Sequence, residues 1–223
     1  MTTPAGAPAV HKPALRGVQH QWAAVVAAVM GFYLVASAPN SVGRVAVAIY
    51  SASLVLLLTV SAVYHRFDWP HRTRMWLRRA DHASIFLLIG GTYTPVTLLC
   101  LDPPANQQLM IVVWSGAAIG ILASMFWPTA PKWVGAVLAI AVGYTIVPYF
   151  SRIAPNLSRM ELALIVVGGI AYTAGAIVYA AKRPNPWPRT YGYHEIFHTL
   201  TLVGAGLHMV AVISIMRALG PAS

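Results

Sequence analysis

The sequence predicts an all-α protein, a bundle of seven transmembrane helices with its N-terminus in the cytoplasm and its C-terminus outside. Of the 223 residues, 58% are hydrophobic and only 9% are charged, and the apolar residues gather in long uncharged runs. Soluble domains carry roughly 25% charged residues. An apolar run of roughly 20 residues crosses a bilayer as a helix, which satisfies its own backbone hydrogen bonds there.

Seven such runs follow one another along the chain. They are expected at 21–38, 45–65, 81–100, 108–127, 133–150, 162–181 and 194–216. The chain is therefore expected to comprise a poorly ordered cytoplasmic tail over residues 1–20, a transmembrane domain over 21–217 and a short C-terminal tail over 218–223.

The basic residues set the expected orientation. The net charge of +10 comes from fifteen Lys and Arg against five Asp and Glu. Such a balance can indicate nucleic-acid binding, but here the basic residues lie in short segments between the apolar runs. With the N-terminus inside, only Arg44, Arg152, Arg159 and Arg217 fall outside. This asymmetry favours N-in, C-out topology, and it favours anionic lipid head groups over nucleic acid as the partner of the positive charge.

Cysteine chemistry is limited to one residue. Cys100 is the only cysteine in the sequence, which excludes an intrachain disulfide and a zinc site with several thiolate ligands. Any metal ion must be held by histidine, carboxylate and water.

Ionisable residues at the ends of three runs indicate a metal site. His194 and His198 are four residues apart, so on a helix they share one face with Cβ atoms about 5–6 Å apart. In the predicted topology the second run ends at His65, the third begins at Asp81, and the seventh begins with the histidine pair, all at the cytoplasmic face. An ionisable side chain in the bilayer costs roughly 2.5–3.5 kcal/mol on insertion scales. We therefore expect the three histidines to bind one zinc ion (Zn²⁺) with an open position, as in catalytic zinc sites.

Asp81 and Ser61 complete the expected site. Asp81 has two possible roles there, as general base toward a zinc-bound water or as a partner that orients a ligand histidine. Ser61, on the helical face of His65, is expected to contact that water or a substrate carbonyl. Plainer alternatives are an interfacial His65, an Asp81 that caps the third helix or pairs with an adjacent arginine, and a Ser61 that only packs.

The other ionisable residues near the apolar runs are weaker candidates for the site. Glu195 matches the general base of H-E-x-x-H metalloproteases, but a carboxylate in a first helical turn is also stabilised by the helix dipole. His208 lies about 15 Å farther along the last helix, so we expect it to be buried and hydrogen-bonded between helices. His82 is expected to be structural or interfacial, and His11 and His20 to be ordinary tail or interface residues.

Three motifs resemble those of the bacterial haemolysin III proteins, which belong to the progestin and adipoQ receptor superfamily and are related to alkaline ceramidases. The motifs are Ser61-x-x-x-His65, Asp81 before a helix with Gly91-Thr92-Tyr93-Thr94-Pro95, and His194-x-x-x-His198. The resemblance implies a seven-helix protein of the bacterial inner (plasma) membrane, with zinc on the three histidines, a water-mediated role for Asp81 and Ser61 nearby. It favours Asp81 over Glu195 as the base.

The leading function is a zinc-dependent intramembrane hydrolase that cleaves a lipid amide or ester and serves membrane lipid homeostasis. The alternatives are a non-enzymatic lipid sensor with a structural zinc ion, a haemolytic membrane protein, and a haem protein with two axial histidines. Haem would leave one member of the His194 and His198 pair unused.

Overall fold

A computed structural model describes residues 15–219, and the expected tail residues 1–14 and 220–223 lie outside this part of the chain. The described chain is all-α. Its helices are α1 Val18–Ala36, α2 Ser41–Arg66, α3 His71–Cys100, α4 Ala105–Phe126, α5 Lys132–Gly143, α6 Phe150–Ile153, α7 Arg159–Ala181 and α8 Tyr193–Ala218, with 3-10 turns η1 Val147–Tyr149 and η2 Ala154–Asn156. Within the described residues, seven segments are long and apolar enough to cross a membrane, Lys132–Asn156 counting as one. The predicted fold class is confirmed, and the protein is a multi-pass membrane protein.

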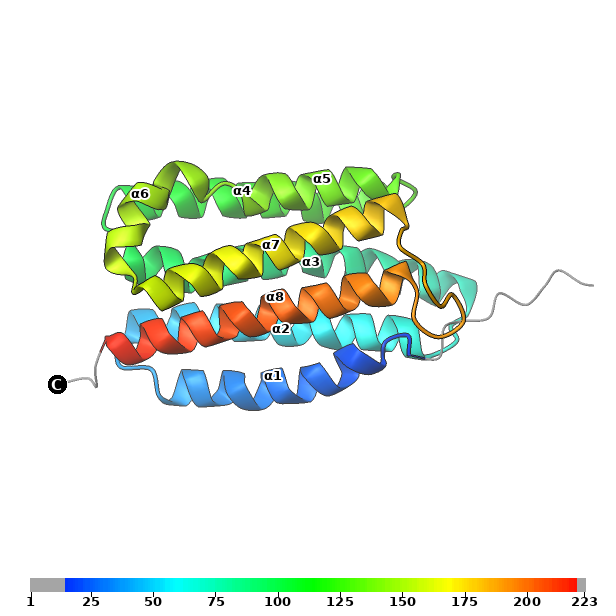
Figure 1. The fold of residues 1–223 in the computed structure, drawn as a ribbon, viewed down its shortest axis with the longest axis horizontal. Helices are drawn as coiled ribbons and strands as arrows, with labels where there is room; N and C mark the ends of the chain where they lie inside the picture. The colour runs from blue at the N-terminus through cyan, green and yellow to red at the C-terminus, as the bar shows by residue number, and fades with distance from the viewer. Residues whose placement is uncertain (1–14, 220–223) are drawn as a thin grey trace, which may run out of the picture.

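The helices lie side by side along the long axis of the bundle (Figure 1). α1 packs on α2, α2 on α3, α3 on α4, and α7 on α8. We call one end of the bundle the histidine end (Figure 1). The helices α1, α3 and α8 begin there, and α2 and α7 end there. α8 ends at the opposite end of the bundle. The assignment of the histidine end to the cytoplasm stays a prediction from the distribution of basic residues.

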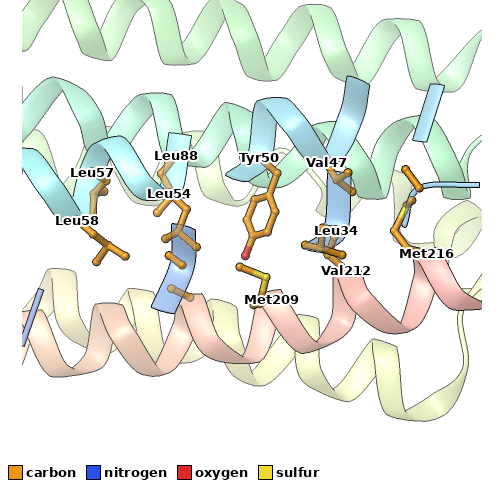
Figure 2. Packing of buried hydrophobic residues seen from close by; sticks show 13 residues of the cluster. Leu34, Val47, Tyr50, Leu54, Leu57, Leu58, Leu88, Met209, Val212 and Met216 are labelled. Carbon is orange, nitrogen blue, oxygen red and sulfur yellow. The ribbon is translucent and has the colours of Figure 1, made fainter. Parts of the chain in front are cut away.

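A tightly packed core joins α1, α2 and α8, and Figure 2 shows its buried side chains meeting between these helices. Tyr50 and Val212 are about 1% exposed. The outward faces are apolar as well, since Phe32 is 78% and Phe126 82% exposed. A soluble monomer rarely exposes such contiguous apolar surface, so these faces are the ones that contact lipid.

Glycines allow α3 and α4 to approach closely. A Cβ added at Gly120 of α4 would collide with the Phe86 ring of α3. Reciprocally, a Cβ added at Gly90 of α3 would lie 3.1 Å from atoms of the Trp114 ring of α4. Small residues at crossing points are a common basis of helix packing in membranes, where apolar attraction to a neighbouring helix is no stronger than to lipid.

Gly120→Val is expected to destabilise the protein. Overpacking of this kind typically costs about 1–3 kcal/mol, because Phe86 and the adjoining backbone must move. Thermal unfolding in detergent measures the loss as a lower Tm. Gly206→Val is the matched control, because nothing lies within 4 Å of a Cβ added there. Equal Tm values for the two variants would contradict the proposed packing.

One expected helix start, that of α3, is wrong. α1 begins at Val18, within a few residues of the expected start at 21. Gly17 precedes it with φ +77°, and its missing Cβ lets the backbone approach the His65 side chain. α3 begins at His71, ten residues before the expected start at 81. The arginines of this segment looked like a loop, but arginine favours helix, so the helix continues beyond its apolar part. Asp81 therefore lies inside α3 and does not cap it.

The fifth segment is broken near its far end. A single helix was expected over 133–150, but α5 stops at Gly143 and the chain continues through short turns. Pro148 and Pro155 lie within those turns. Proline has no backbone N–H to donate within an α-helix, so these two residues favour short turns over a continued helix. The other five segments have ends within a few residues of those expected.

Candidate metal centre

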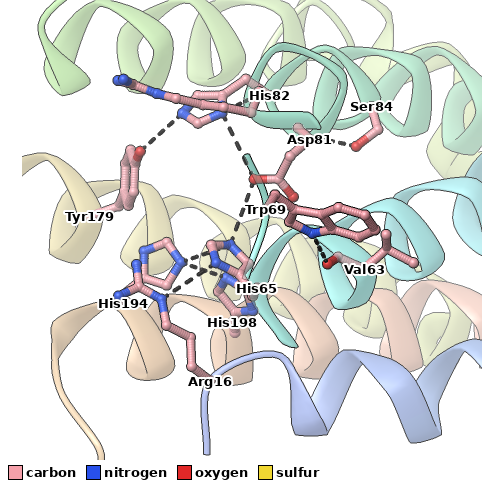
Figure 3. A network of polar contacts seen from close by, with 11 residues as sticks. Arg16, Val63, His65, Trp69, Asp81, His82, Ser84, Tyr179, His194 and His198 are labelled. Carbon is pink, nitrogen blue, oxygen red and sulfur yellow. Dashed lines mark hydrogen bonds and ion pairs between the residues drawn. The ribbon is translucent and has the colours of Figure 1, made fainter. Parts of the chain in front are cut away.

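The end of α2 and the start of α8 bring three imidazoles together, as Figure 3 shows. Nε2 of His194 lies 3.1 Å from Nε2 of His65 and 2.9 Å from Nε2 of His198. One ring nitrogen of each of the three histidines lies within 4.8 Å of a ring nitrogen of each of the other two. His65 and His198 are buried, at 5% and 4% exposure. The expected meeting of these three histidines is therefore observed.

The three nitrogens fit a first-row metal ion by their chemistry, and the two separations around His194 Nε2 fit it by length. Zinc binds imidazole nitrogen at 2.0–2.1 Å, and tetrahedral angles then separate two ligand nitrogens by about 3.3–3.4 Å. The observed separations around His194 Nε2 are only a few tenths of an ångström shorter. Two imidazole nitrogens so close can share a hydrogen bond only if one bears a proton and the other does not. A shared cation removes that requirement for all three rings, and imidazole suits zinc, copper, iron and nickel.

Arg16 contacts the back of one candidate ligand. Its Nε donates a hydrogen bond to His65 Nδ1 over 3.4 Å. Arginine has no acceptor, so this contact requires an unprotonated Nδ1 and leaves the proton of a neutral ring on Nε2. A ring that binds metal through Nε2 carries its proton on Nδ1 instead. The Arg16 contact therefore belongs to the metal-free tautomer of His65.

Asp81 and Ser61 lie beside the histidines. Asp81 Oδ2 is 3.7 Å from His65 Nε2, and the side chain of Asp81 is 14% exposed. Ser61 is 3% exposed and its side chain interacts with the Asp81 carboxyl group. The structure thus places together all five residues that the sequence indicated for the site, with the carboxyl group on the side of the imidazole nitrogens (Figure 3).

His82 extends the polar network to α7. Its Nδ1 lies 2.8 Å from the Arg78 carbonyl oxygen and donates to it. In a neutral ring Nε2 is then an acceptor, and the Tyr179 hydroxyl donates to it over 3.1 Å. The Tyr179 ring also lies 5.8 Å from the His194 ring, centre to centre. Sequence reasoning missed Tyr179, because a tyrosine at the end of an apolar run resembles any interfacial aromatic residue.

His20 forms the wall of the centre on the α1 side. Its ring stacks on the His198 ring with centres 4.0 Å apart and planes at 21°. It is 2% exposed, and neither ring nitrogen has a hydrogen-bond partner within the described residues. Nearby, the Thr199 hydroxyl donates to Gln19 Oε1 over 3.2 Å and ties α1 to α8. The expectation of an ordinary tail histidine was wrong, because the first helix starts before His20 and turns its ring toward α8.

His20→Ala is expected to weaken metal binding by about tenfold, the lower range for residues that support metal ligands. The reason is that the loss of the stacked ring leaves space into which His198 can rotate. His20→Phe keeps a flat ring and is expected to retain affinity. Competition with a chromophoric chelator measures both constants. The control is His208→Ala, which removes another imidazole of α8 that bonds to Ile165 and not to the centre. Equal affinities for the His20→Ala variant and wild type would show that stacking does not hold His198.

Two other candidates have structural roles. Glu195 Oε2 accepts a hydrogen bond from the Gly192 N–H over 2.9 Å in the first turn of α8, so its carboxylate caps the helix in the way expected at a positive helix end. His208 Nε2 donates to the Ile165 carbonyl oxygen of α7 over 3.0 Å, and its ring packs over Gly168. The expectation that His208 bonds between helices is confirmed.

An apolar cavity of about 220 Å³ lies beside the centre, between α3, α4, α5, α7 and α8. Its polar lining at the histidine end includes Arg78, Arg79, His82, Lys132 and Tyr179. The three clustered histidines do not line it. Phe197 and Tyr179 line the cavity and also contact the His194 ring, so they stand between the cavity and the imidazoles.

Fold and site together define the class: an integral membrane protein whose described residues form seven membrane-spanning segments with a three-histidine group at one end. A family model described as haemolysin-III related matches residues 9–209, and the chain belongs to that family. It is 29% identical over 169 residues to hemolysin-3 of Bacillus cereus, covering 76% of this chain and 74% of the relative. It is 28% identical over 165 residues to the hemolysin-3 homolog of Bacillus subtilis, covering 74% of each.

A plant protein is also similar. The heptahelical transmembrane protein ADIPOR2 of Oryza sativa subsp. japonica is 28% identical over 182 residues, which cover 74% of this chain and 79% of the relative. The match supports the relationship to the progestin and adipoQ receptor superfamily that the three motifs indicated.

Proposed function

We propose that the protein is a zinc-dependent hydrolase that cleaves an amide or ester of a membrane lipid, and that it works in the bacterial inner membrane. The observation that carries the proposal is the buried meeting of three imidazole nitrogens with a carboxylate, Asp81 Oδ2 lying 3.7 Å from His65 Nε2. This combination provides ligands for one ion and a separate proton acceptor. The metal ligands and the proton acceptor lie at one end of a bundle that crosses the membrane, whose lipids are the proposed substrate.

The residues divide the chemistry between them. A zinc ion held by the three histidines would polarise a lipid carbonyl and acidify a water molecule. Asp81 takes the proton of the attacking water as general base while the new C–O bond forms, and then returns it to the leaving amine or alcohol as the C–N or C–O bond breaks. Ser61 keeps the Asp81 carboxyl group in position through their interaction.

The apolar cavity supports a lipid as the substrate. It lies next to the centre, and its lining is mostly aliphatic and aromatic, which suits an acyl chain. Tyr179 and Phe197 separate it from the imidazoles. An acyl chain in the cavity therefore presents its carbonyl to the centre only after these two side chains move.

One observation favours a second candidate, a non-enzymatic lipid sensor with a structural zinc ion. Asp81 Oδ2 is close enough to His65 Nε2 that a small shift would make it a fourth ligand. Three histidines and a carboxylate close a tetrahedral site, and closed coordination is typical of structural zinc.

A lipid panel separates the two functions. Purified protein with one zinc ion per chain is incubated with ceramides, lysolipids and acyl amides, and released fatty acid is measured by mass spectrometry. The hydrolase releases acid from at least one class, and chelation of the metal abolishes the release. Metal-loaded protein that leaves every lipid in the panel intact would contradict the hydrolase and favour the sensor.

A further inference from the structure

The apolar cavity has a cationic end. Arg78 and Arg79 of α3 and Lys132 at the start of α5 line the cavity at its histidine end. The rest of its lining is predominantly aliphatic and aromatic, for example Ile85, Ile89 and Leu138, with scattered polar side chains. The cavity therefore has an apolar body and a positively charged end.

Lys132 is held in place at this end of the cavity. Its Nζ donates to the Tyr193 hydroxyl over 2.8 Å. The same nitrogen lies 4.3 Å from the centre of the Tyr179 ring and 4.7 Å from that of Tyr193. Two aromatic faces and one hydroxyl thus fix the ammonium group, which keeps further N–H donors for another partner.

No carboxylate within residues 15–219 forms an ion pair with these cations. The ion pairs of the described residues join Asp81 to His65 and to His82. Glu195 is engaged with the Gly192 N–H. Arg79 Nε is buried and has no hydrogen-bond partner in the described part of the chain. Positive charge beside a low-dielectric cavity attracts an anion more strongly than the same charge in water.

We propose that this cavity binds a single-chain amphiphile whose anionic head group, a phosphate or a carboxylate, is held by Lys132 together with Arg78 and Arg79. The apolar body takes the chain. A volume of about 220 Å³ is below the roughly 300–1,000 Å³ of pockets for drug-sized ligands, so it is too small for two acyl chains. The inference concerns binding and does not require hydrolysis, so a protein that binds the amphiphile and cleaves nothing refutes only the proposed function.

Ordinary contact with bilayer head groups is the competing explanation, since basic residues gather at the cytoplasmic ends of membrane helices for topological reasons. Arg72 and Arg74 serve as controls for it. They lie on α3 close to Arg78, they are exposed, and they do not line the cavity. A bulk charge effect would depend on these residues as much as on Lys132.

Binding is measured on metal-stripped protein in neutral detergent, so that no cleavage occurs. The probes are lysophosphatidic acid, the fatty acid and the monoacylglycerol, all with the same chain. Wild type is expected to bind an anionic probe about tenfold more tightly than the neutral one, the size of effect that one partly buried charge pair produces. The phosphate and carboxylate probes show which head group is preferred.

The variants decide the role of the cations. Lys132→Gln is expected to reduce the anionic preference to near parity, Lys132→Arg to keep it, and Arg74→Gln to leave it unchanged. Equal binding of neutral and anionic probes by wild type would overturn the proposal, whatever the variants do. Equal losses in Lys132→Gln and Arg74→Gln would also overturn it, since they would show that bulk surface charge is responsible.

Discussion

Replacing His194 with alanine is expected to strip the protein of its metal ion. His194 Nε2 is the shared neighbour of the other two candidate nitrogens, 3.1 Å from one and 2.9 Å from the other. Supporting residues around metal ligands are worth about 10–100-fold in affinity, so the loss of a ligand is expected to cost about 100-fold or more. Elemental analysis after gel filtration measures the effect: wild type retains one zinc ion per chain and the variant retains almost none.

Thermal unfolding gives a second readout of the same change. A ligand that binds only the folded state raises stability in proportion to the logarithm of its concentration above Kd. Added zinc is therefore expected to raise the Tm of metal-stripped wild type and to leave that of the His194→Ala variant where it is. The His208→Ala variant serves as control, because His208 bonds to Ile165 and not to the centre. A His194→Ala variant with a full complement of zinc would show that the ion binds elsewhere.

Asp81→Asn is expected to abolish hydrolysis while leaving the metal bound. Asparagine keeps the size of the side chain and an acceptor oxygen for the interaction with Ser61, but it cannot take a proton from water. General base catalysis typically contributes about 10²–10⁴-fold to rate, and kcat is expected to fall by this range. The measurement is the release of fatty acid from the best lipid of the panel, with metal content determined on the same sample.

The control for Asp81→Asn is Glu195→Gln. Glutamine can still accept the hydrogen bond from the Gly192 N–H, so α8 stays capped and the rate of hydrolysis is expected to remain unchanged. Loss of activity in the Glu195 variant and not in the Asp81 variant would reverse the assignment of the base. Loss of metal in Asp81→Asn would identify Asp81 as a fourth ligand and favour the structural zinc of the sensor.

The sequence predicted the seven crossings because a lipid-exposed helix needs about 20 apolar residues, and this pattern does not depend on tertiary contacts. It also predicted the layer that contains His65, Asp81 and His194. Alternate crossings bring the end of one helix and the start of the next to the same face, which places such residues at one depth without any knowledge of packing.

Packing between distant segments was beyond the sequence. His20 belongs to the centre only because α1 lies against α8, and no local pattern encodes that the first and last helices are neighbours. Tyr179 joins the network through His82 of another helix. Lys132 looked like a topology signal, and only the cavity gives it a further use. The early start of α3 at His71 was missed because charged residues are a poor guide to where a helix begins outside the bilayer.

The most direct test of the metal centre is diffraction from a crystal of the protein, with data collected on both sides of the zinc absorption edge. We predict one anomalous peak among the imidazoles of His65, His194 and His198, about 2.0–2.1 Å from each Nε2 atom. A map without a peak between these rings, from crystals whose metal content is confirmed, would contradict the site and every function built on it.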